Sequence, residues 1–317
     1  MMQHPSKSIE SRFLISIALT CSIFIIELVG GWWTGSLALQ SDAAHVFLDV
    51  FALVLSYAAL HMSSLPADEN HTFGYHRLEV FASLINGITL AIISAGIFWE
   101  AYRRLVSPQP VMGIELLAIA VLGLVGNLVV AFILGGHHQA DRQSNQHHDN
   151  HGHHHAELED ANVQSAMFHV LGDAVSSLGV ITAAIVIWQT GWMLADPLAG
   201  LLIGMIIITG SWKVIKSAAQ IMMEGTPACI NLREVEEHML SSPGVADVHD
   251  LHIWNLCSHN AILSAHVVTD DEGWNSWSKV MRDLKSRLKD EFGIEHTTLQ
   301  MEHECCEKDS ICRTIKP

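Results

Sequence analysis

Charged side chains are scarce in this sequence: they make up 16% of its 317 residues, well below the roughly 25% that is usual in soluble domains. Half of the residues are hydrophobic, which a bilayer accommodates more easily than a soluble core does. Basic residues are scarcer than acidic ones, with 17 Lys and Arg against 33 Asp and Glu and a formal charge of −16. Because nucleic-acid binding needs a basic footprint, we expect no nucleic-acid partner.

The sequence also lacks the cysteine spacing of a secreted, disulfide-bonded domain. Three of its six Cys lie in the last thirteen residues, and we interpret the Cys as reduced thiols in a cytosolic setting that could include metal ligands. We also expect no cleavable signal peptide. Residues 1–12 are polar, and the apolar run that follows them is too long for a signal peptide.

Long apolar stretches are what the sequence has instead. Six of them reach about 20 residues, the length of a helix that crosses a bilayer, and six within the first 215 residues argue against a large soluble core. A backbone whose N–H and C=O groups lack hydrogen-bond partners cannot span lipid, so these stretches must be helices. We expect an α-helical membrane protein with transmembrane helices near residues 13–33, 36–60, 80–101, 113–135, 163–188 and 197–215.

The basic residues near the ends of these stretches predict the orientation. An even number of spans leaves both termini on one side, and that side carries six basic residues against only Arg103 and Arg104 on the other. The positive-inside rule therefore predicts cytoplasmic termini. We expect the membrane to be a bacterial inner (plasma) membrane. The six basic residues are Lys7, Arg12, Arg77, Arg142, Lys213 and Lys216.

A His-rich segment lies at residues 137–155, between the fourth and fifth stretches. It holds eight His with Asp and Asn interleaved, a composition that cannot form a core and is typical of a loop. Neighbouring imidazoles bind transition metals at neutral pH. We expect the loop to deliver or sense metal on the cytoplasmic side, with a non-specific metal sponge as the alternative.

The composition changes to that of a soluble domain at about residue 226. We therefore predict a transport domain at 1–225 and a cytoplasmic domain at 226–317. The pattern predicts an αββαβ, ferredoxin-like α+β fold, and alternation places His249, Leu251 and Ile253 on one face of the first strand. The expected elements are helix 231–242, strands 245–256 and 261–269, helix 274–292 and strand 294–302.

Two of the predicted spans carry the same pair of ionisable residues at the same spacing. The second contains His45 and Asp49 in SDAAHVFLDV, and the fifth contains His169 and Asp173 in FHVLGDAV. Ionisable residues within a span are costly and usually functional. Four residues advance a helix by about 6 Å and turn it by only about 40°, so each His shares a face with its Asp. Two such faces opposed would offer one ion two nitrogens and two oxygens.

This set of ligands indicates which metal it binds. Four mixed nitrogen and oxygen ligands in a tetrahedron suit Zn²⁺, whereas Mg²⁺ and Ca²⁺ prefer more oxygens and Cu(I) prefers sulfur. Two carboxylates would be unstable alone in lipid but neutralise one Zn²⁺. Without metal the site should take up protons, so metal binding releases them. The sequence therefore predicts exchange of divalent metal, above all Zn²⁺, for protons, with no organic cofactor.

The residues alone leave alternatives open. A His–Asp pair can be a structural hydrogen bond or a step in a proton relay. A bound metal or haem could serve redox chemistry without transport, although adjacent carboxylates do not suit haem. The His-rich loop and the last domain could also form a membrane metal sensor. We expect a transporter and not a sensor, because sensors seldom need metal ligands within two spans, and we expect no enzyme, because the sequence offers no haem-attachment motif.

Further candidate residues lie outside the two pairs. Asp42 could serve metal or proton access, or form a hydrogen bond between helices. Asp68, His71 and His76, in the loop after the second span, could hold a surface metal. The candidate ligands of the last domain are His249, His252, His259, His266, His296, Glu302, His303, Cys305, Cys306 and Cys312.

These motifs resemble the cation diffusion facilitator family, in its zinc-transporting branch. The matching pieces are GSLAL-SDAAH---D, HTFGYHRLEV, HVLGD---S-G, ADPLAGLLIG, MEGTP, VHDLHIW, LSAHV and TTLQME, and they extend over nearly the whole chain. The resemblance implies a six-helix transporter that works as a homodimer and moves metal out of the cytoplasm while protons move in. It also implies that the cytoplasmic domains bind regulatory metal.

The resemblance assigns residues as well. It implies that His45, Asp49, His169 and Asp173 form the transport site. The loop site of some members falls on Asp68 and His71, but its third ligand falls on Tyr75, with His76 next to it. In the last domain the implied ligands are His249, His266 and Glu302, with the cysteines of the tail in addition.

Overall fold

A computed structural model describes residues 7–135, 172, 174–257, 260–270 and 276–303. The chain divides into two compact units. One comprises Met1–Leu55 and Asn86–Trp212, and the other comprises Ser56–Ile85 and Lys213–Pro317.

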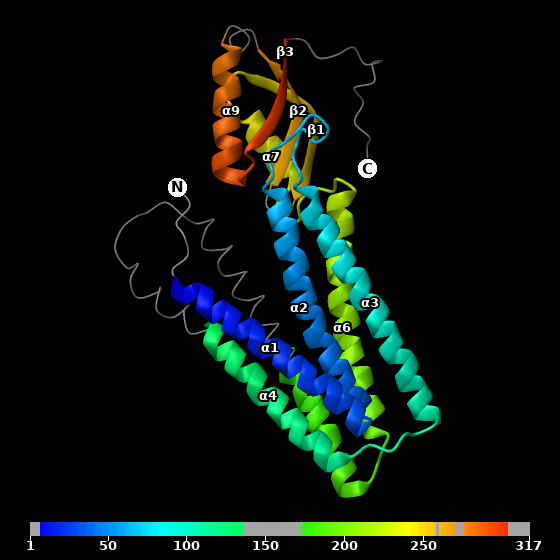
Figure 1. Cartoon of the computed structure of the whole chain (residues 1–317). Coiled ribbons are helices and arrows are strands. Elements are labelled where there is room, and N and C mark those ends of the chain that lie inside the picture. Colours follow the sequence, from blue (N-terminus) through cyan, green and yellow to red (C-terminus); the bar gives the residue numbers. More distant parts are fainter. Residues whose placement is uncertain (1–6, 136–171, 173, 258–259, 271–275, 304–317) are drawn as a thin grey trace, which may run out of the picture. The chain divides into compact units, whose positions relative to one another are not determined.

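Long helices make up most of the described part of residues 7–222 (Figure 1). Four of the described helices are long and apolar enough to cross a membrane: α2, α3, residues Gly113–Val130 of α4, and α6. Shorter apolar helices cover Ala18–Thr34 and Ala174–Thr190. The bounds are α1 Lys7–Thr34, α2 Leu37–Ser63, α3 Arg77–Val106, α4 Gly113–Gly135 and α6 Ala195–Met222.

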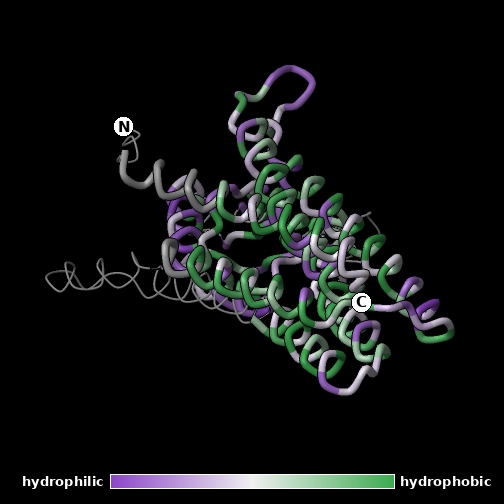
Figure 2. The backbone as a smooth tube through the Cα atoms, turned by 60° about the horizontal axis from the view of Figure 1, so that its bottom comes forward, coloured by the Kyte–Doolittle hydropathy of each residue, from purple (hydrophilic) through white to green (hydrophobic). Residues whose placement is uncertain are grey.

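The surface of these helices fits a bilayer. Hydrophobic residues follow the helices for most of their length (Figure 2), and many large apolar side chains point outward instead of into a core. Large aromatic residues are exposed near the ends of the first, third and fifth spans. Because successive spans alternate in direction, these three run the same way and end on one side. Such a belt is typical of a membrane–water interface. Its members are Trp32, Trp33, Trp99, Tyr102, Trp188 and Trp192.

Helix α6 continues to Met222, beyond the predicted end at residue 215. The predicted end followed the loss of hydrophobicity around Lys213 and Lys216. A helix satisfies its own backbone groups in water as well as in lipid, so it need not end where the apolar layer ends.

Small residues let α1 and α4 approach closely. A Cβ added at Gly123 would lie 2.1 Å from Oε1 of Glu27, and one added at Gly126 would lie 2.6 Å from Cδ1 of Ile23. Lipid supplies no hydrophobic force between helices, so close van der Waals packing of this kind holds them together.

A buried carboxylate joins the starts of α2 and α6. Asp196 accepts hydrogen bonds from the backbone N–H groups of Leu37 at 2.7 Å and Ala38 at 3.1 Å. It therefore satisfies N–H groups that the first turn of α2 leaves without intrahelical partners. Arg104 of α3 lies 3.4 Å from Asp196 and 3.0 Å from Glu100, so the same network neutralises a basic side chain at this end of α3.

The C-terminal part folds as a small α+β domain, as the sequence predicts. Its three-stranded sheet has the order β1-β2-β3, with β1 antiparallel and β3 parallel to β2. Buried residues of both helices and of the strands form one core. The elements are α7 Leu232–Leu240, β1 Val245–Cys257, β2 Asn260–Thr269, α9 Trp277–Phe292 and β3 His296–Glu302.

Strict alternation along β1 is wrong, because a bulge interrupts it. The pairing with β2 shifts register between His249 and His252, and Asp250 has a positive φ of 51°. Val248 and Ile253, on either side of the bulge, are both buried in the core. His249 neighbours Val248 and so faces away from the core, whereas the sequence pattern placed it on the face of Ile253.

Candidate metal centres

The first His–Asp pair lies on one face of α2. Nε2 of His45 is 4.0 Å from Oδ2 of Asp49, the approach that a spacing of four residues gives on a helix. Both side chains are partly buried. The second predicted pair, His169 and Asp173, lies outside the described residues, so the structure describes only one half of the predicted transport site.

A buried carboxylate one turn from this pair joins α2 to the helix Ala174–Thr190. Asp42 is only 3% exposed. The hydroxyl of Ser176 donates to its Oδ1 at 2.6 Å, and the hydroxyl of Ser177 donates to its Oδ2 at 3.3 Å. Of the roles left open for Asp42, the structure therefore contains the hydrogen bond between helices.

In the loop after α2, Asp68 is surrounded by hydrogen-bond donors of the same loop. Its carboxylate accepts from the backbone N–H of Asn70 and of His71 and, at 2.7 Å, from the hydroxyl of Tyr75. Oδ1 of Asp68 also lies 3.2 Å from Nδ1 of His71. The Tyr75 hydrogen bond, followed by that of the His71 backbone, lowers the pKa of Asp68 to about 2. His76 does not join Asp68 and His71 in a metal-sized group.

A metal-sized cluster forms in the C-terminal domain. One ligand atom from each of His249, His266 and Glu302 lies within 4.8 Å of the others. Within the described ranges, these three residues are the one such group of His, Cys, Asp and Glu. Two imidazoles and a carboxylate suit Zn²⁺ and leave a fourth position for another ligand.

Each residue of the cluster comes from a different strand. His249 of β1 pairs with His266 of β2, which pairs with Gln300 of β3, two residues before Glu302. Nδ1 of His266 lies 2.7 Å from Oε1 of Glu302, and Nε2 of His249 lies 3.4 Å from Oε2. Burial by itself raises the pKa of Glu302. This effect is outweighed by hydrogen bonds from Gln300 and His266 and by the charges of His266 and His249, so the pKa of Glu302 is lowered overall.

Sequence reasoning did not include Asp250 among the candidate ligands. The bulge turns its carboxylate toward two imidazoles, with Oδ2 3.8 Å from Nε2 of His266 and Oδ1 3.1 Å from Nε2 of His252. Alternation placed Asp250 and His249 on opposite faces, so only the unusual tolerance of Asp for positive φ could have indicated a bulge here.

The remaining candidates lie apart from this group. The ring of His296 packs edge-on against Phe73, with centroids 5.7 Å apart. His252 and His303 are exposed, and neither joins the group of three. His259, Cys305, Cys306, Cys312 and the His-rich loop lie outside the described residues.

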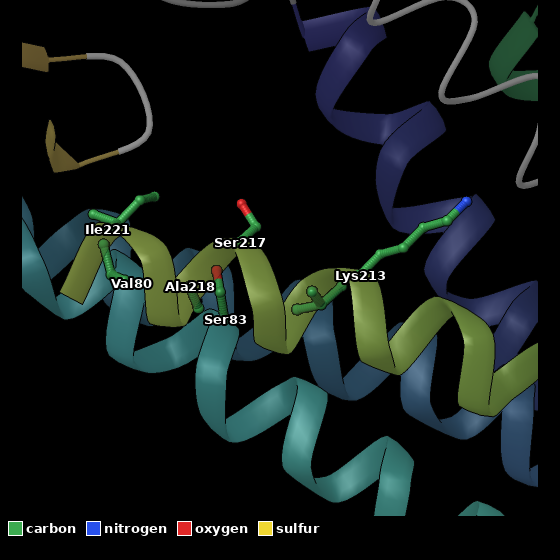
Figure 3. Close-up of a pocket in the computed structure, with 7 residues that line it drawn as sticks. Val80, Ser83, Lys213, Ser217, Ala218 and Ile221 are labelled. Carbon is green, nitrogen blue, oxygen red and sulfur yellow. The ribbon is translucent and has the colours of Figure 1, made fainter. Parts of the chain in front are cut away.

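A cleft of about 320 Å³ opens between α3 and α6 (Figure 3). It is lined by Val80, Ser83, Lys213, Val214, Ser217, Ala218 and Ile221. Its lining contains no His, Cys, Asp or Glu, and its one charged residue is Lys213, so the cleft does not suit a divalent metal.

Comparison with known proteins accounts for nearly the whole chain. A family model described as the cation efflux transmembrane domain matches residues 13–223, and one described as the cation efflux protein cytoplasmic domain matches residues 227–304. The chain belongs to the cation efflux family. This confirms the resemblance carried by its motifs, and the α-helical membrane fold with a small C-terminal α+β domain is confirmed with it.

Three relatives of the family match over almost their full length. The "Metal cation efflux system protein CzcD" of Cupriavidus metallidurans is 38% identical over 96% of this chain and 90% of its own. The "Zinc transporter ZitB" of Escherichia coli is 33% identical over 95% and 90%. The "Cadmium, cobalt and zinc/H(+)-K(+) antiporter" of Bacillus subtilis is 37% identical over 97% and 93%.

A solved structure also matches the C-terminal domain. It is the metal-bound C-terminal domain of the CzcD transporter from Cupriavidus metallidurans, with 46% identity over 23% of this chain and 99% of that chain, at a TM-score of 0.22.

Because family and relatives are transporters, this chain is a multi-pass membrane transporter that exports cations, and not an enzyme.

Proposed function

We propose that this cation efflux protein exports Zn²⁺, and related divalent metals such as Cd²⁺, from the cytoplasm in exchange for protons. His45 and Asp49 of α2 and His169 and Asp173 of the fifth span form the transport site. The relatives named for zinc, and for cadmium, cobalt and zinc with protons, support this choice of substrates.

The observation that carries the proposal is the bond between Asp42 and Ser176. It fixes the level at which α2 meets the helix Ala174–Thr190. The second and fifth spans cross in opposite directions, and Ala38 and Leu39 accordingly pack in one core cluster with residues between Val180 and Ile187. In two antiparallel helices that share one contact, residues at equal numbers of positions from that contact, counted in opposite directions along the sequence, lie at the same height.

The spacing along the two helices then matches on both sides. Counting inward from Asp42, His45 is three residues away and Asp49 is seven. Counting inward from Ser176, Asp173 is three residues away and His169 is seven. At about 1.5 Å per residue, a fifth span that is helical from about residue 163 would bring His45 level with Asp173 and Asp49 level with His169. Each level would offer one imidazole and one carboxylate to a shared ion.

Exchange with protons follows from the charge of this site. Two carboxylates balance one Zn²⁺ in the low dielectric of the membrane, and the empty site must hold protons in place of the metal. A site that holds either metal or protons couples the two fluxes when it opens alternately to the two sides. The pH gradient across a bacterial inner membrane would then drive export.

We also propose that His249, His266 and Glu302 hold a second, regulatory metal in a cytoplasmic domain at 226–317. The distances within the cluster support this role, and Asp250 is a candidate fourth ligand. With both termini in the cytoplasm, as the basic residues indicate, this metal would report the cytoplasmic concentration. The protein would work as a homodimer, as its resemblance to the family implies.

The test is zinc flux into proteoliposomes with an imposed pH gradient. Wild type should move Zn²⁺ against protons and release protons when Zn²⁺ binds, and Asp49→Ala should abolish both. Glu115→Ala is the matched control, because Glu115 is an exposed carboxylate at the start of α4. Unchanged flux in Asp49→Ala, or flux that ignores the pH gradient, would contradict the proposal. Binding without flux in wild type would favour a sensor.

A further inference from the structure

Asp42 occupies an unusual position for a carboxylate. It is buried within a bilayer-spanning helix, where an uncompensated carboxylate costs several kcal/mol. Both of its oxygens accept hydroxyl hydrogen bonds, and both hydroxyls come from another span. The neighbouring Ser41 is buried as well, but its hydroxyl donates to Leu37 O within the same helix. Asp42 therefore holds α2 to a second helix, and Ser41 does not.

Helix register in a membrane needs a device of this kind. A slip of one residue moves a helical side chain by about 1.5 Å along the axis and 100° around it. A zinc site tolerates ligand distances within only about 0.2 Å. Lipid supplies no hydrophobic force between helices, so directional hydrogen bonds and close packing must fix the register.

We propose that Asp42 is a positioning residue for transport: with Ser176 and Ser177 it fixes the register of α2 against the fifth span and thereby sets the ligand geometry of the transport site. The inference rests on the proposed transport site. Asp42 lies one turn away from His45 along α2, about 4.5 Å of rise, and it acts through the helix without binding metal itself. Its role is to accept two hydroxyl hydrogen bonds across the helix interface.

The experiment compares variants that remove acceptor, charge or donors. Asp42→Ala and the double variant Ser176→Ala with Ser177→Ala each remove the link. Both should raise KM for Zn²⁺ flux and the Kd for Zn²⁺ by roughly 10- to 100-fold, the usual loss when partners behind metal ligands are removed, with a smaller change in maximal rate. Asp42→Asn keeps an oxygen that accepts from Ser176, and a Ser hydroxyl can accept from the new amide. It should therefore lose the least affinity.

Controls separate a positioning role from general damage. Ser41→Ala removes a buried hydroxyl whose bond stays within α2, so it should leave Kd and KM unchanged. Combining Asp42→Ala with the double Ser variant should cost no more than either alone, because all of them break the same link. Thermal unfolding reports whether each variant is folded. If Asp42→Ala fails to fold, Asp42→Asn and the double Ser variant still decide the question.

Two results would overturn the inference. Wild-type Kd and KM in the double Ser variant would show that the link does not matter. A loss in Asp42→Asn as large as in Asp42→Ala, with the Ser pair dispensable, would show that the charge of Asp42 serves as a ligand or proton carrier. Asp49→Ala distinguishes the two proposals: if it abolishes flux while the link variants are neutral, only the positioning role fails. If Asp49→Ala transports normally, the transport site itself is wrong.

Discussion

Asp68 and Glu302 lie outside the bilayer-spanning helices, and both have a lowered pKa for different reasons. The hydroxyl of Tyr75 and backbone N–H groups stabilise ionised Asp68 in an exposed loop. Burial works against ionised Glu302, and hydrogen bonds from Gln300 and His266 with the charges of two imidazoles outweigh it. The partners that lower the pKa of Asp68 are thus mainly the Tyr75 hydroxyl and backbone N–H groups, whereas those of Glu302 include His266 and His249, which are candidate metal ligands.

Glu302→Gln should make the thermal stability of the protein depend less on pH in the acidic range. A carboxyl with a lowered folded-state pKa stabilises the fold fully above its unfolded-state value, 4.5 for Glu, and loses this contribution as pH falls through the folded-state value. In chelator, wild type should therefore melt at a higher temperature than Glu302→Gln at pH 6, and the difference should disappear as pH falls through the lowered folded-state pKa of Glu302. Glu295→Gln, at a side chain 75% exposed, is the control. A difference that persists at low pH would disprove the role of ionised Glu302.

At the scale of elements, the sequence predicts each helix and strand of the described chain but not the irregularity in β1. Hydropathy indicates the spans, since each must match the thickness of a bilayer. Alternation indicates strands, yet it assumes two residues per repeat throughout. The bulge at Asp250 breaks this repeat, and it arises from pairing with β2, a segment that alternation in β1 does not include.

Substitution at Asp250 should test the bulge. A β-branched residue is strained at positive φ, so Asp250→Val should cost about 1–3 kcal/mol of stability and weaken metal binding by His249 and His266. Asp250→Gly should cost much less, because Gly adopts positive φ freely. Ala246→Val, at an exposed position of β1, is the control. The measurements are thermal unfolding and zinc stoichiometry, and equal effects of Val and Gly at 250 would argue against the bulge.

At the scale of the whole molecule, one exception to the charge asymmetry has a structural cause. Arg103 and Arg104 lie at the end of α3 that the positive-inside rule expects to be poor in basic residues. Arg104 is largely buried and pairs with Glu100 and with Asp196, and Arg103 lies 3.2 Å from Glu100. Both therefore have acidic partners within the protein, which accounts for their place at this end of α3.

Deleting residues 137–155 should affect the apparent KM of transport more than its maximal rate. A His-rich loop that delivers metal raises its local concentration at the entrance, so the deletion should raise the apparent KM for Zn²⁺ flux more than it lowers the maximal rate. Proteoliposome flux over a range of Zn²⁺ concentrations measures both values. Replacing the segment with a Gly/Ser linker of equal length is the control for chain connectivity. Abolished transport in the linker variant would show that the loop is essential and not accessory.

The sequence by itself determined the features that depend on neighbours along the chain. Bilayer-length apolar runs indicate spans, and a spacing of four residues places His45 and Asp49 on one face of α2 whatever surrounds that helix. The tertiary structure decided which residues meet across the chain, although the family resemblance had already pointed to His249, His266 and Glu302 as a group. Asp42 meets Ser176 across a separation of 134 residues, and the cluster of His249, His266 and Glu302 depends on strand order, register and a bulge. Such contacts follow from packing between distant segments, which no local pattern encodes.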